Sequence, residues 1–488
     1  MPEYKAVQEG SQLAAFFHLY LLYCLNRISH LSLPTYSKLN IVILAAGKGT
    51  RMNSSKPKVL HALAGKPVLQ HVLDTARRLN PSSIIVVYGF GGEIVPQALP
   101  ADDIIWVKQA EQLGTGHAMQ QALPYLEPDA RTLILLGDVP LLTQESCTQL
   151  LTQQAALCLL TVSKDNPSGY GRIVRQGDAV KAIVEHKDAA EAQLAIREVN
   201  TGIMAAENTW LATWLPRLDN RNAQQEYYLT DIVAMAVADG QAVAAVQSND
   251  EWQVAGINSK QDLAALERVY QGRYAARLLA KGVTLADPSR IDVRGELTTG
   301  RDVEIDVGCV FEGQVTLADN VRIGPYCVIR DATIGAGTTL AAYTHIDGAT
   351  LAEDCRIGPY ARLRPGTVLS DHAHIGNFVE LKNAQVDSGS KINHLSYVGD
   401  ATVGKQVNIG AGTITCNYDG VNKFRTVIED NAFIGSDSQL VAPVTIKAGA
   451  TIAAGSTITE DAPADKLTMS RVRQFTIENW KRPEKVKK

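Results

Sequence analysis

The chain has 488 residues, a formal net charge of −4 and 45% hydrophobic residues. This length and composition describe a folded protein of two or three domains, which excludes a single small module and a disordered chain. The near-neutral charge gives no general attraction to nucleic acid. The seven cysteines are scattered without a Cys-x-x-Cys pair, which indicates neither a disulfide framework nor a zinc site.

The first segment, residues 1–38, contains one apolar run at 13–25 (LAAFFHLYLLYCL). This run is too short to cross a bilayer core of about 30 Å, and it includes His18. The residues before it hold two Glu and one Lys, and no small-x-small cleavage site follows, so it does not fit a secretory signal. We expect residues 1–38 to be an extension outside the fold that reflects an upstream start codon, with a membrane-surface anchor as the alternative.

Residues 39–258 alternate short β-branched runs (IVILAAG, IIVVYG, LILLGD, LLTVS) with helical stretches. This alternation predicts crossover units and a Rossmann-like, mostly parallel sheet. In residues 259–282, apolar side chains recur at steps of three and four, which predicts one amphipathic linker helix. The residues that carry this pattern are Leu263, Leu266, Tyr270, Tyr274 and Leu278.

Residues 283–465 follow a period of six, which fits neither a helix nor a plain strand but suits a solenoid with flat sides six residues apart. Aliphatic or aromatic residues stand in phase at Ile305, Phe311, Leu317, Ile323 and Ile329, then, after single deletions, at Ile334, Leu340, Ile346, Leu351, Ile357, Leu363, Leu369, Ile375 and Leu381, and later from Ile428 to Ile458. We therefore predict a parallel β-helix of hexapeptide repeats. A polar excursion interrupts it at 413–425, and residues 466–488 form a basic tail, either solvated or docked near an anionic ligand.

A glycine-rich turn, LAAGKGTRM at 44–52, follows the first apolar run. Gly47 and Gly49 let the backbone approach a phosphate, while Lys48 and Arg51 supply positive charge. The turn is neither the Walker pattern nor the dinucleotide fingerprint, and Pro57-Lys58 follows it.

Further polar groups follow in the same region. Gln109 and Gln112 offer amides suited to a base edge, and Asp138 ends an apolar strand where ligands gather in α/β sheets. Asp138 is a natural Mg²⁺ ligand, or alternatively the cap of a turn. The remaining candidates supply turns, a carboxylate and carboxamides that suit sugar hydroxyls and N-acetyl groups; they are Gly171, Glu185, Asn200 and Asn258.

Taken together, LAAGKGTRM, PKVLH, QAEQLGTGHA, GDVPL, GYGRI, VEHKDA, NTGI and EYYLTD, with RLRPG, GNFVE, HLSYVGD and NIGAGTITCNYDG, resemble one family from about residue 40 to 483. It is the family of bifunctional N-acetylglucosamine-1-phosphate uridylyltransferases and glucosamine-1-phosphate N-acetyltransferases. The resemblance implies an α/β nucleotidyltransferase domain followed by a left-handed β-helix. It also implies a cytoplasmic homotrimer that acetylates glucosamine 1-phosphate with acetyl-CoA. The same enzyme would then transfer uridylyl from UTP with Mg²⁺, giving UDP-N-acetylglucosamine for peptidoglycan and lipopolysaccharide precursors.

For the first activity, the resemblance implies that Arg51 and Lys58 bind phosphates and stabilise the transition state, and that Asp138 and Asn258 carry Mg²⁺. The nucleotide and sugar would contact Leu44, Ala45, Ala46, Gly47, Lys58, Gln109, Gln112, Gly114, Thr115, Gly137, Gly171, Glu185, Asn200 and Asn258. The chain departs from the family at Leu136, where relatives often have an aromatic residue, which puts a side-chain contact to the nucleoside in doubt.

For the second activity, transfer from a thioester to an amine needs a base, and histidine suits this role near neutral pH. The resemblance implies that His394 is that base. The sugar phosphate would contact Arg364, Lys382, Tyr397, Asn408 and Lys423, and acetyl-CoA would contact Ala411, Ser436, Ala454 and Arg471. We do not expect Cys416 to act as a nucleophile, because no His lies near it in sequence.

Two other interpretations remain at the level of sequence. One is a nucleotidylyltransferase with a single activity whose β-helix serves only as a scaffold, and the set His394, Lys382, Asn408 and Lys423 argues against it because a scaffold needs none of them. The other is a non-catalytic assembly protein, which would be expected to lack Lys58 or Asp138.

Overall fold

The computed structural model describes residues 38–483 and residue 485. The extension predicted at 1–38 lies outside these residues except for Lys38. The described residues divide into two compact units. The first contains residues 38–62 and Pro67–Leu266, and the second contains Leu63–Lys66 and the described residues from Glu267 onward. Among the described residues, no helix is both long and apolar enough to cross a bilayer.

The first unit is built on a nine-stranded sheet whose main order is β11-β7-β10-β6-β1-β4-β5, with β8 and β9 joined to it through β10. The strands are β1 Leu39–Ala45, β4 Ser83–Tyr88, β5 Ile104–Lys108, β6 Arg131–Leu136, β7 Leu157–Ser163, β8 Arg172–Gln176, β9 Ala179–Val184, β10 Glu198–Glu207 and β11 Val243–Ser248. β10 runs antiparallel to β6 and β7, while β1, β4, β5 and β6 are parallel. The predicted Rossmann-like, mostly parallel sheet is confirmed.

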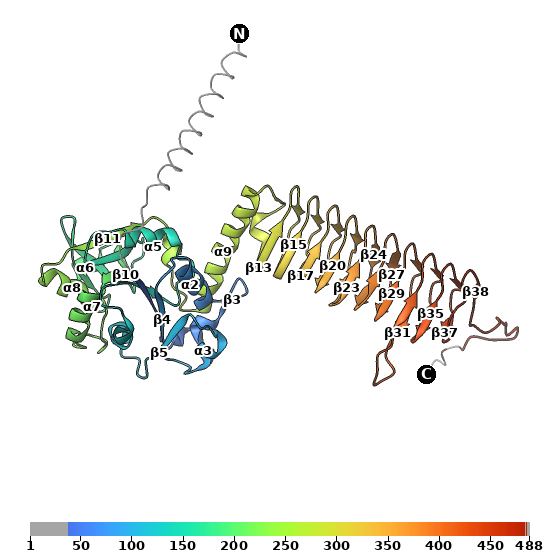
Figure 1. Cartoon of the computed structure of the whole chain (residues 1–488), viewed down its shortest axis with the longest axis horizontal. Helices are drawn as coiled ribbons and strands as arrows, with labels where there is room; N and C mark the ends of the chain where they lie inside the picture. Colours follow the sequence, from blue (N-terminus) through green and yellow to red (C-terminus); the bar gives the residue numbers. More distant parts are fainter. Residues whose placement is uncertain (1–37, 484, 486–488) are drawn as a thin grey trace, which may run out of the picture. The chain divides into compact units, whose positions relative to one another are not determined.

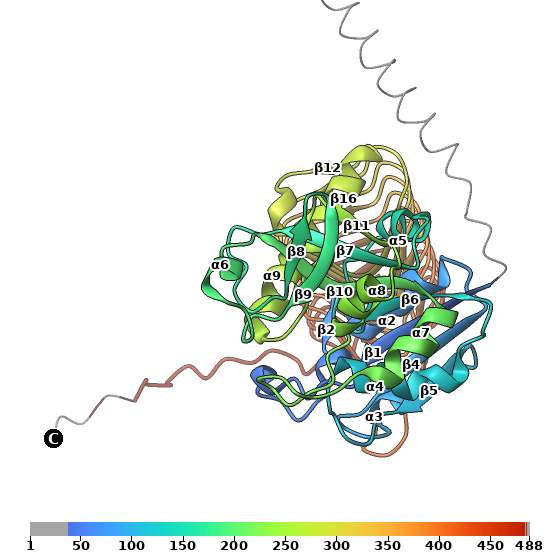
Figure 2. The same cartoon turned by 90° about the vertical axis from the view of Figure 1, so that its left-hand side faces the viewer.

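Helices cover both faces of this sheet (Figures 1 and 2). They are α2 Val68–Arg77, α3 Ile94–Ala98, α4 Thr115–Ala122, α5 Gln144–Leu151, α6 Glu191–Leu194, α7 Asn208–Trp214 and α8 Asp231–Ala238. Side chains of α2 and α5 pack in one apolar core with Ile41 and Ile43 of β1, and those of α4, α7 and α8 pack in the other with Val42. Because β1 is buried on both faces, its sequence is a nearly continuous apolar run and does not alternate between apolar and polar residues.

The second unit is a three-faced parallel β-helix preceded by α9 (Lys260–Ala280), which begins in the first unit and continues into the second. The first face consists of β12 Thr284–Leu285, β14 Glu304–Ile305, β16 Arg322–Ile323, β18 Thr339–Leu340, β21 Arg356–Ile357, β24 His374–Asn377, β27 Lys391–His394, β30 Asn408–Ile409, β33 Phe433–Ile434, β36 Thr451–Ile452 and β38 Leu467–Thr468. The second face has β19 His345–Asp347, β22 Arg362–Leu363, β25 Glu380–Lys382, β28 Tyr397–Gly399, β31 Ile414–Cys416, β34 Gln439–Val441 and β37 Thr457–Ile458. The third has β20 Ala349–Leu351, β23 Thr367–Leu369, β26 Gln385–Val386, β29 Ala401–Val403, β32 Thr426–Ile428 and β35 Val444–Ile446, while β13 Ile291–Thr299, β15 Cys309–Leu317 and β17 Val328–Ile334 span two faces.

One aliphatic side chain per face points into the core of this β-helix. Ile323, Leu340, Ile357 and Ile375 stack in register through β16, β18, β21 and β24, and each is at most 3% exposed. This stacking is the physical origin of the six-residue period. The predicted hexapeptide β-helix is therefore confirmed.

Two boundaries differ from the sequence expectation. The excursion expected from residue 413 begins only after Cys416, because Ile414–Cys416 form β31 and pair with β34. The tail expected from residue 466 begins later, because Leu467–Thr468 add a strand to β36. In both places, residues expected to be irregular instead form a strand of the β-helix.

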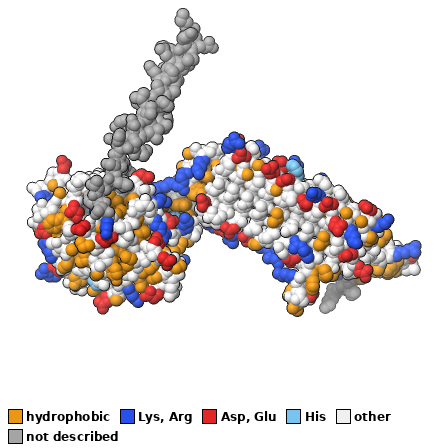
Figure 3. Space-filling model, viewed as in Figure 1, with side chains coloured by type: hydrophobic (Ala, Val, Ile, Leu, Met, Phe, Trp, Pro, Cys, Tyr) orange, Lys and Arg blue, Asp and Glu red, His pale blue; other side chains and the backbone are white. Residues whose placement is uncertain are grey.

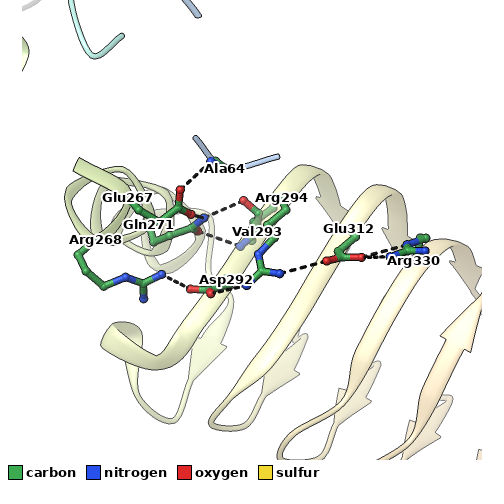
Figure 4. Close-up of polar contacts among 9 residues, drawn as sticks. All are labelled: Ala64, Glu267, Arg268, Gln271, Asp292, Val293, Arg294, Glu312 and Arg330. Atoms are coloured by element: carbon green, nitrogen blue, oxygen red, sulfur yellow. Dashed lines mark hydrogen bonds and ion pairs between the residues drawn. The ribbon is translucent and has the colours of Figure 1, made fainter. Parts of the chain in front are cut away.

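The helix α9 caps the first coil of the β-helix (Figure 4). Gln271 is 2% exposed, and its amide donates to the carbonyl of Val293 (2.9 Å) and accepts from the N–H of Val293 (2.8 Å). Tyr274 Oη accepts from the N–H of Leu297 (3.0 Å). These side chains pair with backbone groups of β13 that would otherwise lie at an open strand edge.

Candidate active sites

Two adjoining cavities lie at the carboxyl ends of β1 and β6 in the first unit. The glycine-loop cavity (≈ 480 Å³) is lined by the turn after β1. The Glu185 cavity (≈ 390 Å³) is lined by the turn before β8, by Glu185 after β9, by residues of β10 and by the residues just before α8. Leu44, Thr115, Leu136 and Asp138 line both cavities. The two cavities therefore form one cleft, at the strand edge where ligands gather in open α/β sheets.

The predicted residues of the first unit divide between the two cavities. The glycine-loop cavity receives Leu44, Ala45, Ala46, Gly47, Lys58, Gln109, Gln112, Gly114, Thr115 and Asp138. The Glu185 cavity receives Arg51, Asp138, Gly171, Glu185, Asn200 and Asn258. Gly137 lines neither of the two cavities. It packs against β1, and its N–H donates to the carbonyl of Leu44 (2.9 Å).

The glycine-rich turn wraps around the side chain of Lys58. Gly49 has φ 59°, and a Cβ there would lie 2.9 Å from Cβ of Lys58. Glycine is therefore required at Gly49 both for the left-handed backbone and for the close approach. Lys58 itself is the first residue of a short 3-10 helix, Lys58–Leu60, which aims its side chain along the turn.

At the junction of the cavities, the Lys58 ammonium contacts oxygens from two distant parts of the chain. Its Nζ pairs with Oδ2 of Asp138 and donates to Oδ1 of Asn258 at 3.2 Å. The loop of Asn258 is held by Asp262, whose carboxylate accepts from the N–H groups of Asn258 (3.0 Å) and Ser259 (2.8 Å). The geometry thus brings a carboxylate and an amide oxygen to one cation.

The oxygens of Asp138 and Asn258 fit Mg²⁺ by their chemistry. Mg²⁺ prefers hard oxygen ligands and is commonly held by one or two protein groups together with waters and substrate phosphates. The described residues contain no cluster of three His, Cys, Asp or Glu side chains arranged to hold a metal. A magnesium ion here would therefore depend on the substrate for part of its coordination.

The loop carrying Gln109 and Gln112 is tightly folded. Nε2 of Gln109 donates to the carbonyl of Gly114 (3.1 Å), and Nε2 of Gln112 donates to the carbonyl of Gln109 (3.0 Å). Gly114 has φ 111°, and a Cβ there would lie 2.6 Å from the carbonyl oxygen of Tyr227. Both amide side chains are thereby held at the wall of the glycine-loop cavity.

Glu185 contributes a partly buried carboxyl group to the cavity named after it. Its Oε1 accepts from the Thr230 hydroxyl at 3.0 Å, and burial raises the pKa of the carboxyl above its usual value. A Cβ on Gly171 would lie 3.2 Å from this same oxygen, so the carboxylate lies directly against the Gly171 backbone. Sequence reasoning did not single out Thr230, although the EYYLTD motif contains it.

Leu136 occupies the position between the two cavities. It lines both of them, and its Cδ1 would lie 2.7 Å from a Cβ on Gly202. Leu136 therefore supplies an apolar wall that packs on the NTGI segment, and an aromatic ring at this position would need additional space.

The second unit gathers a cationic cluster on the second face of the β-helix. Arg364 forms an ion pair with Glu380 (2.8 Å), and the pKa of Lys423 is lowered by its contact with Lys382 and by the charge of that neighbour. Tyr397 lies in register with Glu380 on the adjacent strand. Arg364, Lys382, Tyr397 and Lys423 therefore lie together, as an anion-binding group would.

His394 lies at the corner that ends β27. Its Nδ1 is 2.9 Å from Oδ1 of Asn377. Because an amide oxygen only accepts, this contact favours the tautomer in which Nδ1 carries the proton and Nε2 is the basic nitrogen. In the following coils, Ala411, Ser436 and Ala454 continue the same corner, since the N–H of Gly412 donates to the carbonyl of His394 and that of Gly455 to the carbonyl of Ser436. The Arg471 guanidinium donates to the carbonyl of Ala454 (2.9 Å).

Asn408 is placed apart from the cationic cluster. It begins β30 on the first face, in register with Lys391, whereas the cluster lies on the second face. Within the described part of the chain, no hydrogen bond links the Asn408 side chain to the cluster. Cys416 is half-buried, and burial raises the pKa of its thiol, which does not favour a nucleophile.

Three family models match parts of the chain. A MobA-like NTP transferase domain matches residues 41–198, a GMPPB C-terminal domain matches 293–386, and the bacterial transferase hexapeptide (six repeats) matches 425–460. A solved structure, a putative glucose-1-phosphate thymidylyltransferase from Bacillus anthracis in complex with a sucrose, is 17% identical, with a TM-score of 0.39 over 47% of this chain and 95% of that one. The fold and its cleft define a nucleotidyltransferase joined to a hexapeptide-repeat transferase.

Curated relatives match almost the whole chain. The bifunctional GlmU proteins of Herminiimonas arsenicoxydans, Janthinobacterium sp. (strain Marseille) and Dechloromonas aromatica are each 61% identical over 92% of this chain and 100% of the relative. The chain belongs to the GlmU family of bifunctional enzymes. It is an N-acetylglucosamine-1-phosphate uridylyltransferase and a glucosamine-1-phosphate N-acetyltransferase.

Proposed function

We propose that uridylyl transfer takes place in the joined cleft of the first unit, with the nucleotide in the glycine-loop cavity and the amino sugar in the Glu185 cavity. The observation that carries this proposal is the Lys58 ammonium, which contacts Asp138 and Asn258 where the two cavities meet. The sugar phosphate and the α-phosphorus of UTP would meet at this junction. Gln109 and Gln112 would face the base, and Gly171, Glu185 and Asn200 the sugar.

The proposed residues act mainly by positioning and by charge. The sugar phosphate oxygen is already a good nucleophile, so no strong base is required, and the main barrier is bringing two anions together. Lys58 and Arg51 would neutralise the phosphates and the departing pyrophosphate. Asp138 and Asn258 would hold Mg²⁺, which supplies charge neutralisation of the bound phosphates.

We propose that acetyl transfer uses His394 as the base. Nε2 would accept a proton from the ammonium group of glucosamine 1-phosphate, and the freed amine would attack the thioester carbonyl of acetyl-CoA. The nitrogen–carbonyl bond forms, the carbon–sulfur bond breaks, and CoA leaves as a thiol after taking up a proton. Arg364, Lys382, Tyr397 and Lys423 would bind the sugar phosphate, while Ala411, Ser436, Ala454 and Arg471 would line the path of acetyl-CoA.

The separation of Asn408 from the cationic cluster supports a site shared between copies of the chain. Asn408 lies on a different face of the β-helix from Lys382, so a site that uses both would form where Asn408 of one copy meets the cluster of another. We therefore propose a homotrimer as the active form. We also propose that it works in the cytoplasm, where UTP and acetyl-CoA are made, and that its product serves peptidoglycan and lipopolysaccharide synthesis.

The test is a coupled assay with glucosamine 1-phosphate, acetyl-CoA, UTP and Mg²⁺ that follows free CoA and pyrophosphate separately. We expect Lys58→Ala to lower pyrophosphate release by orders of magnitude while CoA release stays intact. His394→Ala should abolish CoA release, and supplied N-acetylglucosamine 1-phosphate should restore pyrophosphate release. Two results would contradict the assignment of two separate sites, provided that the variant melts at the temperature of the wild type: loss of CoA release in Lys58→Ala, or loss of pyrophosphate release from supplied N-acetylglucosamine 1-phosphate in His394→Ala.

A further inference from the structure

A buried guanidinium lies directly behind the wall of the Glu185 cavity. Arg172 begins β8, is 1% exposed and is among the largest fully buried side chains of the chain. Its Nη1 donates to the carbonyl of Tyr170, and its Nη2 lies 3.4 Å from both the carbonyl of Leu194 and Nδ1 of His186. None of these partners is a carboxylate, and within the described residues Nε has no partner. Burying a charge without a counter-ion lowers the stability of a fold. A role in the neighbouring site would account for such a residue.

The backbone of Arg172 adjoins the three segments that carry Gly171, Glu185 and Asn200. It follows Gly171 in the chain, and it pairs with Val184 of β9 and Val199 of β10, which directly precede Glu185 and Asn200. The cavity-lining residue on each of the three segments is thus one position away from Arg172 or from its strand partner. The side chain adds contacts to Tyr170 and His186, the neighbours of Gly171 and Glu185.

This arrangement matters because the cavity wall is close-packed. The Glu185 carboxylate lies against Gly171, and the N–H of Asn200 donates to the carbonyl of Gly171 (2.9 Å). A shift of the Tyr170–Gly171 turn would therefore displace all three groups together. The planar guanidinium offers several donors in a fixed geometry, which suits the simultaneous binding of two carbonyls and an imidazole.

We propose that Arg172 is a positioning residue for the amino sugar, holding Gly171, Glu185 and Asn200 in their binding geometry without touching the sugar. This inference depends on the proposed location of the sugar in the Glu185 cavity. The nucleotide side of the cleft carries none of the segments that Arg172 holds. Arg172 therefore governs the KM for N-acetylglucosamine 1-phosphate and leaves the KM for UTP and acetyl transfer unchanged.

The test compares Arg172→Met, Arg172→Lys and the matched control Arg175→Met in the full-length enzyme. Arg175 lies on the same strand but pairs with Glu198 (2.6 Å) and lines neither cavity. Loss of hydrogen bonds from a charged donor is expected to raise the KM for the sugar phosphate about tenfold or more in Arg172→Met. Arg172→Lys keeps the charge and some donors, so its KM for the sugar phosphate should lie between those of Arg172→Met and the wild type. The KM of the control Arg175→Met should equal that of the wild type.

Three outcomes would overturn the proposal. One is an unchanged sugar KM in both Arg172 variants. Another is an equal rise in the KM for UTP, and the third is a similar effect in Arg175→Met. The melting temperature and the acetyl-transfer rate of each variant identify a general folding defect. If Arg172→Met has such a defect, the sugar KM of Arg172→Lys decides the test. Glu185→Gln is measured in parallel: if it leaves the sugar KM unchanged, the proposed sugar site fails, whereas an effect there without one at Arg172 overturns only the positioning role.

Discussion

The imidazole of His61 joins two segments that carry proposed active-site residues of the first unit. It lies three residues after Lys58, is 8% exposed, and its Nδ1 accepts from Nζ of Lys260, two residues after Asn258. Burial, together with the charges of Lys260 and Lys56, lowers the pKa of His61 below its ordinary value. The folded state therefore requires a neutral ring, because a protonated one would face two lysines and lose its acceptor.

This requirement predicts acid sensitivity of the first unit. In the unfolded chain His61 takes up a proton near its ordinary pKa of about 6.5, whereas in the fold it stays neutral to lower pH. The stabilisation is therefore complete above about pH 6.5 and is lost as pH falls through the lowered pKa, with a slope of at most about 1.4 kcal/mol per pH unit. Thermal unfolding of the first unit at several pH values measures this slope.

The matched variant is His61→Asn, whose amide oxygen can still accept from Lys260 but does not titrate. We expect its stability to depend less on pH than that of the wild type over the same range. Identical pH dependence in the two proteins would show that His61 is not the group responsible.

At the scale of secondary-structure elements, α9 closes an otherwise open solenoid end. The first coil has no preceding coil to pair with β13, so the amide of Gln271 and the hydroxyl of Tyr274 take that place. On the surface beside them, Arg268, Asp292, Arg294, Glu312 and Arg330 form a chain of ion pairs that continues from α9 onto the first coils (Figure 4). Exposed ion pairs of this kind contribute little individually, so the buried amide is the stronger element of the cap.

We predict that Gln271→Leu destabilises the second unit, because it leaves the N–H and carbonyl of Val293 unpaired in a buried place. The expected cost is about 2 to 3 kcal/mol in the free energy of unfolding. Denaturant unfolding, together with hydrogen exchange at Val293, measures it. The control Gln261→Leu changes an exposed residue of the same helix, and an equal loss of stability there would contradict the capping role.

The repeat of the β-helix could be predicted from the sequence, whereas the grouping of the site residues could not. The six-residue period follows directly from one inward aliphatic per face, as in the stack Ile323, Leu340 and Ile357. The convergence of Lys58 with Asp138 and Asn258 is different, since these residues are separated by 80 and 200 positions and only the folded sheet brings them together. Their grouping was available only through family resemblance. Arg172 stands in the GYGRI motif, but the role proposed for it depends on burial and on strand partners that a motif does not reveal.

At the scale of the whole molecule, one polypeptide has both activities, and our proposal assigns one of them to each of its two units. Figure 3 shows Lys, Arg, Asp and Glu side chains of both signs over the visible face of the two units, in keeping with the net charge of −4. Such a surface suits small anionic substrates that are bound by local clusters rather than by a general field. The second activity also serves as an internal folding control for variants of the first.

The basic tail offers a prediction that separates the activities. A chain that ends at Ser470 keeps β38, whose residues still pair with Thr451 and Ala453 of the preceding coil, but it loses Arg471 and its contact with Ala454. We expect this truncation, and Arg471→Ala to a smaller degree, to raise the KM for acetyl-CoA while uridylyl transfer from supplied N-acetylglucosamine 1-phosphate is unchanged. The two rates are measured on one preparation by free CoA and by pyrophosphate. Full acetyl transfer by the truncated chain would show that the tail is not part of the acetyl-CoA site. Loss of both activities would indicate that the tail stabilises the whole protein.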